Sequence, residues 1–144
     1  TNPENLGALV RIAVCFGVDL VILGPGCCDP FSRRVLRISM GTAFAIPLFE
    51  SENLDADLEL LRRQHGFALL ATILEDDAEP VAAASRGRRM GLLMGNEAHG
   101  LAPEWIARCD RKVTIPMNAG VDSLNVAVAA GIFLHHFTRE IRAV

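Results

Sequence analysis

Short apolar runs alternate with segments of helical spacing along the chain, and this alternation constrains the fold more than any other feature. Val18–Leu23, for example, is a β-branched run closed by glycine and proline, which is typical of a buried strand and its turn. The pattern predicts strands at 18–23, 44–49, 67–74, 91–94 and 112–115, and helices at 3–16, 31–40, 54–64, 103–108 and from Asp122 or Ser123 to 141. Strands separated by helices pair in parallel, so we expect an α/β fold with a mostly parallel sheet and helices on both faces.

Chain length and cysteine content limit which classes of protein the chain can belong to. At 144 residues the chain is expected to form one domain, residues 1–144, without internal repeats. No apolar run is long enough for a membrane span, so no membrane partner is expected, and the polar start is unlike a signal peptide. The four cysteines lack a CxxC pair, which favours reduced thiols in a cytoplasmic protein over a zinc site, and no metal is expected.

The overall charge argues against a generic nucleic-acid binder. Lys and Arg number 14 against 17 Asp and Glu, giving a net charge of −3, whereas such binders usually carry a positive excess. The chain has no Tyr and one Trp, so an aromatic platform for single-stranded nucleic acid is not expected. Nearly all its basic residues are Arg, which suits phosphate recognition and equally fits a general preference for Arg over Lys.

Two segments near the ends of predicted elements carry small and amide-bearing residues. Asn5 and Arg11 lie six positions apart, so an unbroken helix would point them about 240° apart. Arg11 taken alone is explained by a surface salt bridge. The segment from Gly95 to Leu101 follows an apolar strand and presents backbone groups at the carboxyl edge of the sheet, where α/β proteins bind ligands. An ordinary glycine-rich turn is the alternative there.

A third such segment runs from Ile115 to Val126 and opens the last helix. A helix start offers N–H groups that its own turns do not use, together with a positive dipole end. Capping by Asp122 or Ser123 would explain one polar residue there but not Asn125. The three segments together predict a ligand pocket.

The order of these segments resembles the SpoU/TrmH-type group of the SPOUT RNA methyltransferases, over nearly the whole chain. The first family motif matches Asn5-Leu6-Gly7-Ala8-x-x-Arg11 with Phe16-Gly17, and the second matches Gly95-Asn96-Glu97-x-x-Gly100-Leu101. The third matches Ile115-Pro116-Met117 with Ser123-Leu124-Asn125-Val126, and Arg37 to Gly41 resembles a further family segment.

The resemblance implies a fold, a cofactor and a reaction. The fold would be an α/β domain with a deep trefoil knot in its C-terminal part, an exception to the rule against knots. The cofactor would be S-adenosylmethionine, and its methyl group would pass to a ribose 2′-hydroxyl of tRNA or rRNA. The family works as a homodimer, which fits a last helix that is apolar on many sides.

The resemblance also assigns site residues. Arg11 would sit by the target hydroxyl and activate it electrostatically, because a guanidinium with a pKa above about 12 is a poor base. Implied catalytic residues are Asn5, Arg11, Glu97, Ser123 and Asn125, and implied cofactor contacts are Thr72, Leu74, Gly95, Asn96, Gly100, Ile115, Met117 and Leu124. RNA needs local rather than total positive charge, so we expect RNA contacts at Arg33, Arg34, Arg37, Arg86, Arg88 and Arg89.

Some features depart from the family pattern. Ala98 stands where the second motif commonly has Gly, and Ala127 stands where the third often has Ser. The chain begins at the first motif, so we expect a longer natural protein, with a possible N-terminal RNA-binding region. Two other readings stay open: an inactive RNA-binding member of the family, and an unrelated Rossmann-like nucleotide binder built on Gly24-Pro25-Gly26, which lacks the third glycine of that fingerprint.

Overall fold

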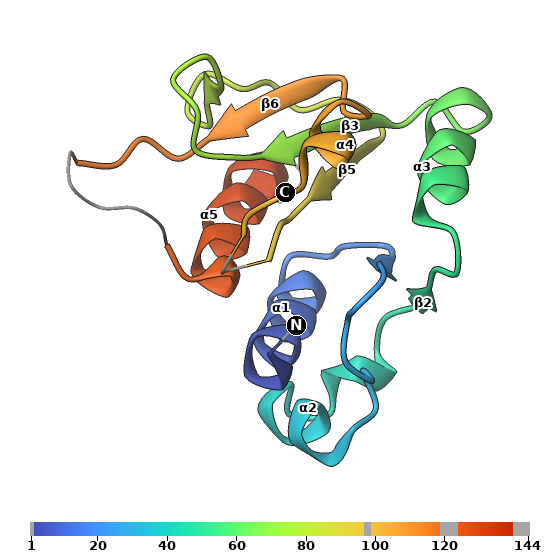
Figure 1. Ribbon diagram of the computed structural model, residues 1–144. Helices are drawn as coiled ribbons and strands as arrows, with labels where there is room; N and C mark the ends of the chain where they lie inside the picture. Colours follow the sequence, from blue (N-terminus) through green and yellow to red (C-terminus); the bar gives the residue numbers. More distant parts are fainter. Residues whose placement is uncertain (1, 97–98, 119–123, 140–144) are drawn as a thin grey trace. The chain divides into compact units, whose positions relative to one another are not determined.

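The computed structural model describes residues 2–96, 99–118 and 124–139 (Figure 1). The chain divides into two compact units. Unit 1 comprises Thr1–Leu54 with Ala130–Val144, and unit 2 comprises Asp55–Ala129.

Unit 1 is built around helix α1 (Pro3–Cys15). The helix starts where the sequence predicts, because the side-chain oxygen of Asn2 accepts the N–H of Glu4 at 2.9 Å. It ends in a Schellman motif, with Gly17 at φ +69° and the N–H of Val18 bonded to the Ala13 carbonyl at 3.0 Å. Its buried face packs with α2 (Arg33–Ile38) and the 3₁₀ helix η1 (Thr42–Phe44), forming a core of Leu6, Val10, Ala13, Leu23, Val35, Ala43 and Ile46.

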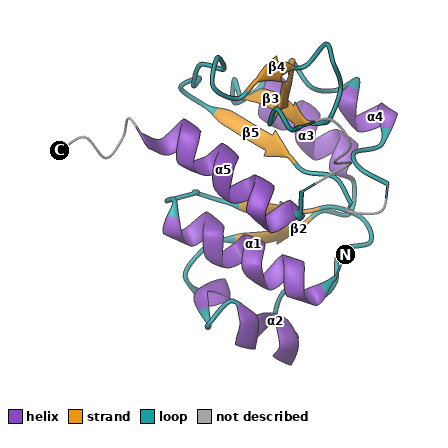
Figure 2. Cartoon of the chain, turned by 90° about the vertical axis from the view of Figure 1, so that its left-hand side faces the viewer, coloured by secondary structure: helices purple, strands orange, loops and turns teal. Residues whose placement is uncertain are grey.

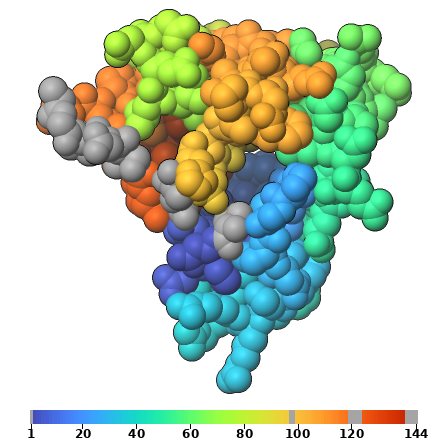
Figure 3. All heavy atoms as spheres, viewed as in Figure 1, coloured from blue at the N-terminus to red at the C-terminus, as the bar shows by residue number. Residues whose placement is uncertain are grey.

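Strands β1 (Val21–Leu23) and β2 (Leu48–Glu50) form a parallel pair in unit 1, with Val21 opposite Leu48. The predicted strand at 18–23 is shortened because Val18 still belongs to the end of α1. The predicted start of the next strand at Phe44 is wrong. Phe44 ends η1, which Gly41 (φ +77°) introduces, and the Thr42 hydroxyl donates to the Ser39 carbonyl at 2.7 Å. In Figure 3 the cyan part of the surface belongs to the stretch that contains α2 and η1.

Unit 2 holds a sheet whose strands all pair in parallel, which confirms the predicted α/β class (Figure 2). Its strand order is β4-β6-β3-β5. The strands are β3 (Ala68–Thr72), β4 (Glu79–Pro80), β5 (Met90–Leu93) and β6 (Arg111–Thr114), and the helices are α3 (Leu54–Arg63), α4 (Pro103–Ile106) and the start of α5 (Val126–Thr138). Strand β4 lies in a stretch predicted as connection, because two residues including a proline give no periodic signal.

The central strand β3 is tied to the loop before β6 through Asp110. Leu69, Leu70 and Ala71 are buried, as expected for a strand covered on both faces. One carboxylate oxygen of Asp110 accepts the N–H of Leu69 at 2.8 Å, and the other accepts from Arg62 at 2.8 Å. Burial raises the pKa of Asp110, but the hydrogen bonds from Leu69 and Arg62 outweigh it and hold that pKa below its usual range.

Helix α5 starts later than predicted and has a different cap. The side-chain oxygen of Asn125 accepts the N–H groups of Ala127 at 2.9 Å and Val128 at 3.3 Å, so Asn125 is the N-cap. The expected caps, Asp122 and Ser123, lie outside the described residues. No helix in the described part of the chain is long and apolar enough to cross a membrane.

Candidate active site

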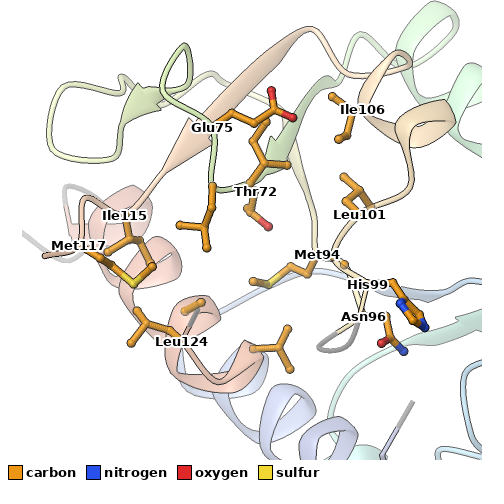
Figure 4. A pocket seen from close by; sticks show the side chains of 16 residues that line it. Thr72, Glu75, Met94, Asn96, His99, Leu101, Ile106, Ile115, Met117 and Leu124 are labelled. Carbon is orange, nitrogen blue, oxygen red and sulfur yellow. The ribbon is translucent and has the colours of Figure 1, made fainter. Parts of the chain in front are cut away.

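The carboxyl ends of β3, β5 and β6 meet at one edge of the unit 2 sheet, because the three strands are parallel. A cavity of about 500 Å³ opens at this edge (Figure 4), within the roughly 300–1,000 Å³ typical of small-molecule sites. It is lined by the segments that follow the three strands, by Ile106 of α4 and by the start of α5. The lining residues are Thr72, Ile73, Leu74, Glu75, Met94, Gly95, Asn96, His99, Gly100, Leu101, Ile106, Ile115, Met117, Leu124, Val126 and Ala129.

The loop after β5 is folded back on itself by backbone hydrogen bonds. Asn96 and Gly100 exchange two N–H···O bonds, at 2.9 and 2.7 Å. Gly95 has no room for a side chain, since a Cβ built there would lie 2.2 Å from the Gly100 carbonyl carbon and from the Leu101 nitrogen. Gly100 takes φ +67°, a conformation that favours glycine. The glycines of the second motif are thus required by the shape of the loop, whereas Glu97 and Ala98 lie outside the described residues.

The end of β3 supplies a hydroxyl and a carboxylate to the cavity. The hydroxyl of Thr72 donates to the Leu93 carbonyl at 2.8 Å and so ties the ends of β3 and β5 together. Glu75 accepts from the ammonium group of Lys112 at 2.7 Å, and Lys112 also reaches Asp77 at 3.1 Å. Hydrogen bonds to Glu75 and Asp77 raise the pKa of Lys112, which therefore stays charged and offsets the negative charge at this edge.

The remaining lining is mainly apolar. Figure 4 shows Met94 between Leu101 and Ile106 on one side and Ile115, Met117 and Leu124 on the other. Asn96 and His99 lie near each other on the β5 loop in the same view. A slot of aliphatic and thioether side chains suits a flat apolar group such as a nucleobase, and backbone amides and carbonyls of the loops can pair with its polar edge. Among the described side chains, no three His, Cys, Asp or Glu converge as metal ligands would.

All eight residues that the resemblance implies as cofactor contacts line this one cavity. Eight further lining residues are not among the implied cofactor contacts: Ile73, Glu75, Met94, His99, Leu101, Ile106, Val126 and Ala129. These include three that the sequence could have indicated, because Glu75 directly follows a predicted strand, Met94 ends one and His99 lies within the second motif. Ile106 could not be found in this way, because only the three-dimensional path of α4 brings it to the cavity.

The implied catalytic residues fall in different places. Asn5 and Arg11 both belong to the unbroken helix α1 of unit 1, so their side chains leave that helix in different directions. Asn125 caps α5 beside the cavity residue Leu124. Glu97 and Ser123 lie outside the described residues.

Arg11 is exposed, and it forms no salt bridge with any residue that the structure describes. The surface salt bridge that would explain this arginine structurally is therefore not seen within the described residues. Nearby Gly7 has a structural reason to be small, since a Cβ there would lie 2.9 Å from the Ile38 side chain and 3.1 Å from the Val35 carbonyl. Gly7 thus allows α1 and α2 to pack closely.

The two arginine groups lie in different units and are exposed. Arg33, Arg34 and Arg37 project from α2 and line a shallow hollow, and Arg34 is paired with Glu4. In unit 2, the loop directly before β5 carries Arg86, Arg88 and Arg89. The guanidinium of Arg89 donates to the His65 carbonyl at 2.7 Å.

Comparison with known proteins identifies similar sequences and structures. The model of the SpoU rRNA Methylase family matches residues 1–135. An uncharacterized tRNA/rRNA methyltransferase of Mycobacterium tuberculosis is 41% identical in an alignment of length 143 that covers 96% of this chain and 49% of that protein. The 23S rRNA (guanosine(2553)-2′-O)-methyltransferase RlmP of Bacillus subtilis is 33% identical over 135 residues, covering 94% and 53%. The chain spans about half the length of the curated relatives that it matches.

Two solved structures are similar in fold and carry a cofactor. The AdoMet-bound rRNA methyltransferase from Sinorhizobium meliloti superposes with a TM-score of 0.90 at 33% identity, covering 99% of this chain and 54% of that one. The SpoU methyltransferase AviRb from Streptomyces viridochromogenes, in complex with AdoMet, gives 0.88 at 30% identity, covering 100% and 58%.

Proposed function

The chain belongs to the SpoU rRNA methylase family, and we propose that it transfers a methyl group from S-adenosylmethionine to a ribose 2′-hydroxyl of rRNA or tRNA. The observation that carries the proposal is the cavity of unit 2, where the segments after three parallel strands and the cap of α5 meet. The choice of the 2′-hydroxyl is supported by relatives named for that reaction, among them the Bacillus subtilis protein.

The residues of the cavity fit the proposed cofactor. Leu101, Ile106, Ile115 and Met117 offer apolar surface for an adenine ring. The closed loop between Gly95 and Gly100 offers backbone groups at close range, because no side chain stands at either glycine. When bound, S-adenosylmethionine supplies a methyl group whose carbon is electrophilic without a metal ion, because it is attached to a positively charged sulfur.

The protein's own part in the proposed reaction is to position and polarise the acceptor. We propose that the guanidinium of Arg11 binds the ribose hydroxyl and its neighbouring phosphate, so that negative charge developing on the oxygen is stabilised while the hydroxyl proton passes to solvent water. Asn5, Glu97 and Ser123 are proposed to complete the polar surroundings. Asn125 is proposed to act as a positioning residue, because its side-chain oxygen fixes the start of α5 next to Leu124.

The test is binding followed by transfer. Isothermal titration should show S-adenosylmethionine and its demethylated product binding to the folded chain, whereas NAD should not bind. Incubation with tritiated cofactor and rRNA or tRNA should yield label in ribose, located by mass spectrometry. Failure of the folded chain to bind either form of the cofactor would refute the proposal, and preferred binding of NAD would favour the Rossmann-like reading. Cofactor binding without transfer to any cellular RNA would point to an inactive member of the family.

We also propose that the chain forms a homodimer through α5. Val128 and Ile132 are 52% and 38% exposed, and they lie one turn apart on this helix. The substitution Val128→Glu should therefore shift the protein from dimer to monomer in sedimentation velocity, because a charge would be buried in the interface. Leu60→Glu, at an exposed leucine of α3, is the matched control and should leave the dimer intact. A wild-type chain that sediments as a monomer at all concentrations would contradict the dimer.

Two further properties remain proposals that follow from the family. One is the deep trefoil knot in the C-terminal part of the chain. The other is a cytoplasmic location, where rRNA and tRNA would be available as substrates.

A further inference from the structure

Two phenylalanine rings form an exposed stack on unit 1. The rings of Phe31 and Phe44 lie 5.7 Å apart at their centres, with 25° between their planes. Phe31 is 47% exposed and Phe44 is 74% exposed, although phenylalanine is among the residues most often buried. The scarcity of Tyr and Trp argues against an aromatic platform for single-stranded nucleic acid, but that expectation did not take this phenylalanine pair into account.

Local hydrogen bonds hold both rings in place. The N–H of Phe31 donates to the carboxylate of Asp29 at 2.8 Å, immediately before α2. The N–H of Phe44 donates to the Gly41 carbonyl at 3.1 Å and closes η1, which rests on the buried Ser39 through the hydroxyl of Thr42. The pair is thus part of an ordered surface, and a ligand that stacks on it would need little rearrangement of the backbone.

The segment that carries the pair is rich in positive charge, although Asp29 at its start and Glu4 beside Arg34 are acidic. Residues 30–49 contain three Arg and no Asp or Glu, in a chain whose net charge is −3. All three arginines are exposed on α2 and line one hollow of the surface. Arg34 is paired with Glu4, which leaves Arg33 and Arg37 as the stronger candidates for a phosphate.

We propose that this surface binds unpaired nucleotides of the RNA substrate, with a base stacked on Phe31 and Phe44 and the flanking phosphates on Arg33 and Arg37. Every base presents a π-face, so a phenylalanine pair can hold single-stranded RNA without reading its sequence. Bases inside a duplex are already stacked and cannot reach the pair. The inference rests on the proposed function, since it gives the RNA substrate a single-stranded segment at a defined place on unit 1.

RNA fits this surface better than a second copy of the chain does. A two-fold interface brings the same patch of both copies together. The arginines of one α2 would then face those of the other, which like-charge repulsion opposes. Phosphates would instead neutralise them.

The test compares a short unstructured RNA oligonucleotide with the duplex that it forms with its complement, both fluorescein-labelled, by anisotropy. Phe44→Ala should weaken binding of the single strand about 5- to 150-fold, the range expected for losing one stacked base, and leave the duplex affinity unchanged. Phe44→Trp should retain the single-strand affinity. Phe49→Ala is the matched control, because Phe49 is also 47% exposed but lies on β2 outside the pair. Arg33→Ala should weaken binding of both RNAs and reduce the salt dependence.

The outcomes separate this inference from the proposed function. Unchanged single-strand binding by Phe44→Ala, or an equal loss on the duplex, would overturn the stacking surface. So would conversion of a wild-type dimer to a monomer by Phe44→Ala, since the patch would then contact another copy. A wild-type chain that binds S-adenosylmethionine but not the single strand would overturn the stacking surface alone. A folded wild-type chain that does not bind the cofactor would refute the proposed function itself.

Discussion

Replacing Gly95 by alanine should abolish measurable binding of S-adenosylmethionine, with a loss of at least about 100-fold. The added Cβ would meet the Gly100 carbonyl carbon and the Leu101 nitrogen at 2.2 Å and the Gly100 oxygen at 2.5 Å. These are backbone atoms that cannot move aside as a side chain end could, so the loop itself must open. Losing two of the backbone hydrogen bonds that are proposed to hold the cofactor, at about 1–1.5 kcal/mol each, corresponds to an effect of roughly this size. Isothermal titration of the folded variant gives the measurement.

Gly87→Ala provides the matched control for this prediction. The nearest atom to a Cβ at Gly87 is the Arg89 carbonyl oxygen at 3.7 Å, an ordinary contact, so cofactor affinity should stay at the wild-type value. Circular dichroism and thermal unfolding would show that both variants keep the fold. Wild-type affinity in a folded Gly95→Ala variant would mean that the loop after β5 does not shape the cofactor site.

The second large effect is expected at Arg11. Arg11→Ala should lower the rate of methyl transfer about 100- to 1,000-fold, the range found when one charge-stabilising donor is removed from an active site. Cofactor affinity should not change, because Arg11 belongs to α1 and is not among the residues that line the cavity. Arg11→Lys should recover part of the rate, since it keeps the charge but loses the two-pronged geometry. Single-turnover transfer of tritiated methyl to rRNA and tRNA measures the effect.

Arg63→Ala is the control for this second prediction. Arg63 is an exposed helix arginine of α3 that is paired with Glu59, so its removal should leave the transfer rate unchanged. If Arg11→Ala transfers methyl groups as fast as the wild type, Arg11 has no catalytic role and the proposed activation of the hydroxyl must come from another group.

The cavity of unit 2 could be predicted from the sequence because parallel pairing determines which loops meet. Once 67–74, 91–94 and 112–115 are recognised as parallel strands, their carboxyl ends share one edge. All eight implied cofactor residues follow or end these strands, or precede the last helix, and all eight line the cavity. The wrong prediction at Phe44 arises where two local structures, a 3₁₀ helix and a strand, compete for the same residues. The hydroxyl of Thr42 and the turn at Gly41 favour a 3₁₀ helix where β-branched and aromatic residues alone favour a strand.

Contacts between residues distant in sequence could not be predicted in this way. The stack of Phe31 on Phe44 depends on the tight turn between α2 and η1, and the pairing of Arg62 with Asp110 depends on where α3 ends relative to β6. The cap of α5 illustrates a different difficulty. Asn125, Ser123 and Asp122 are all good caps, and the sequence does not say which of them the first turn will use.

The strand order of unit 2 delays the folding of its sheet during protein synthesis. Among the strands that the structure describes in this sheet, none pairs with the next one along the chain, because β3 pairs with β5 and β6, and β4 pairs with β6. Ala68 must meet Met90 and Leu70 must meet Arg111, so each pair closes a long loop, which slows folding. On the ribosome, where the N-terminal part emerges first, both edges of β3 stay unpaired until β5 and β6 have been synthesised. The cavity at its carboxyl end is therefore completed only after the last strand and the start of α5 have left the ribosome.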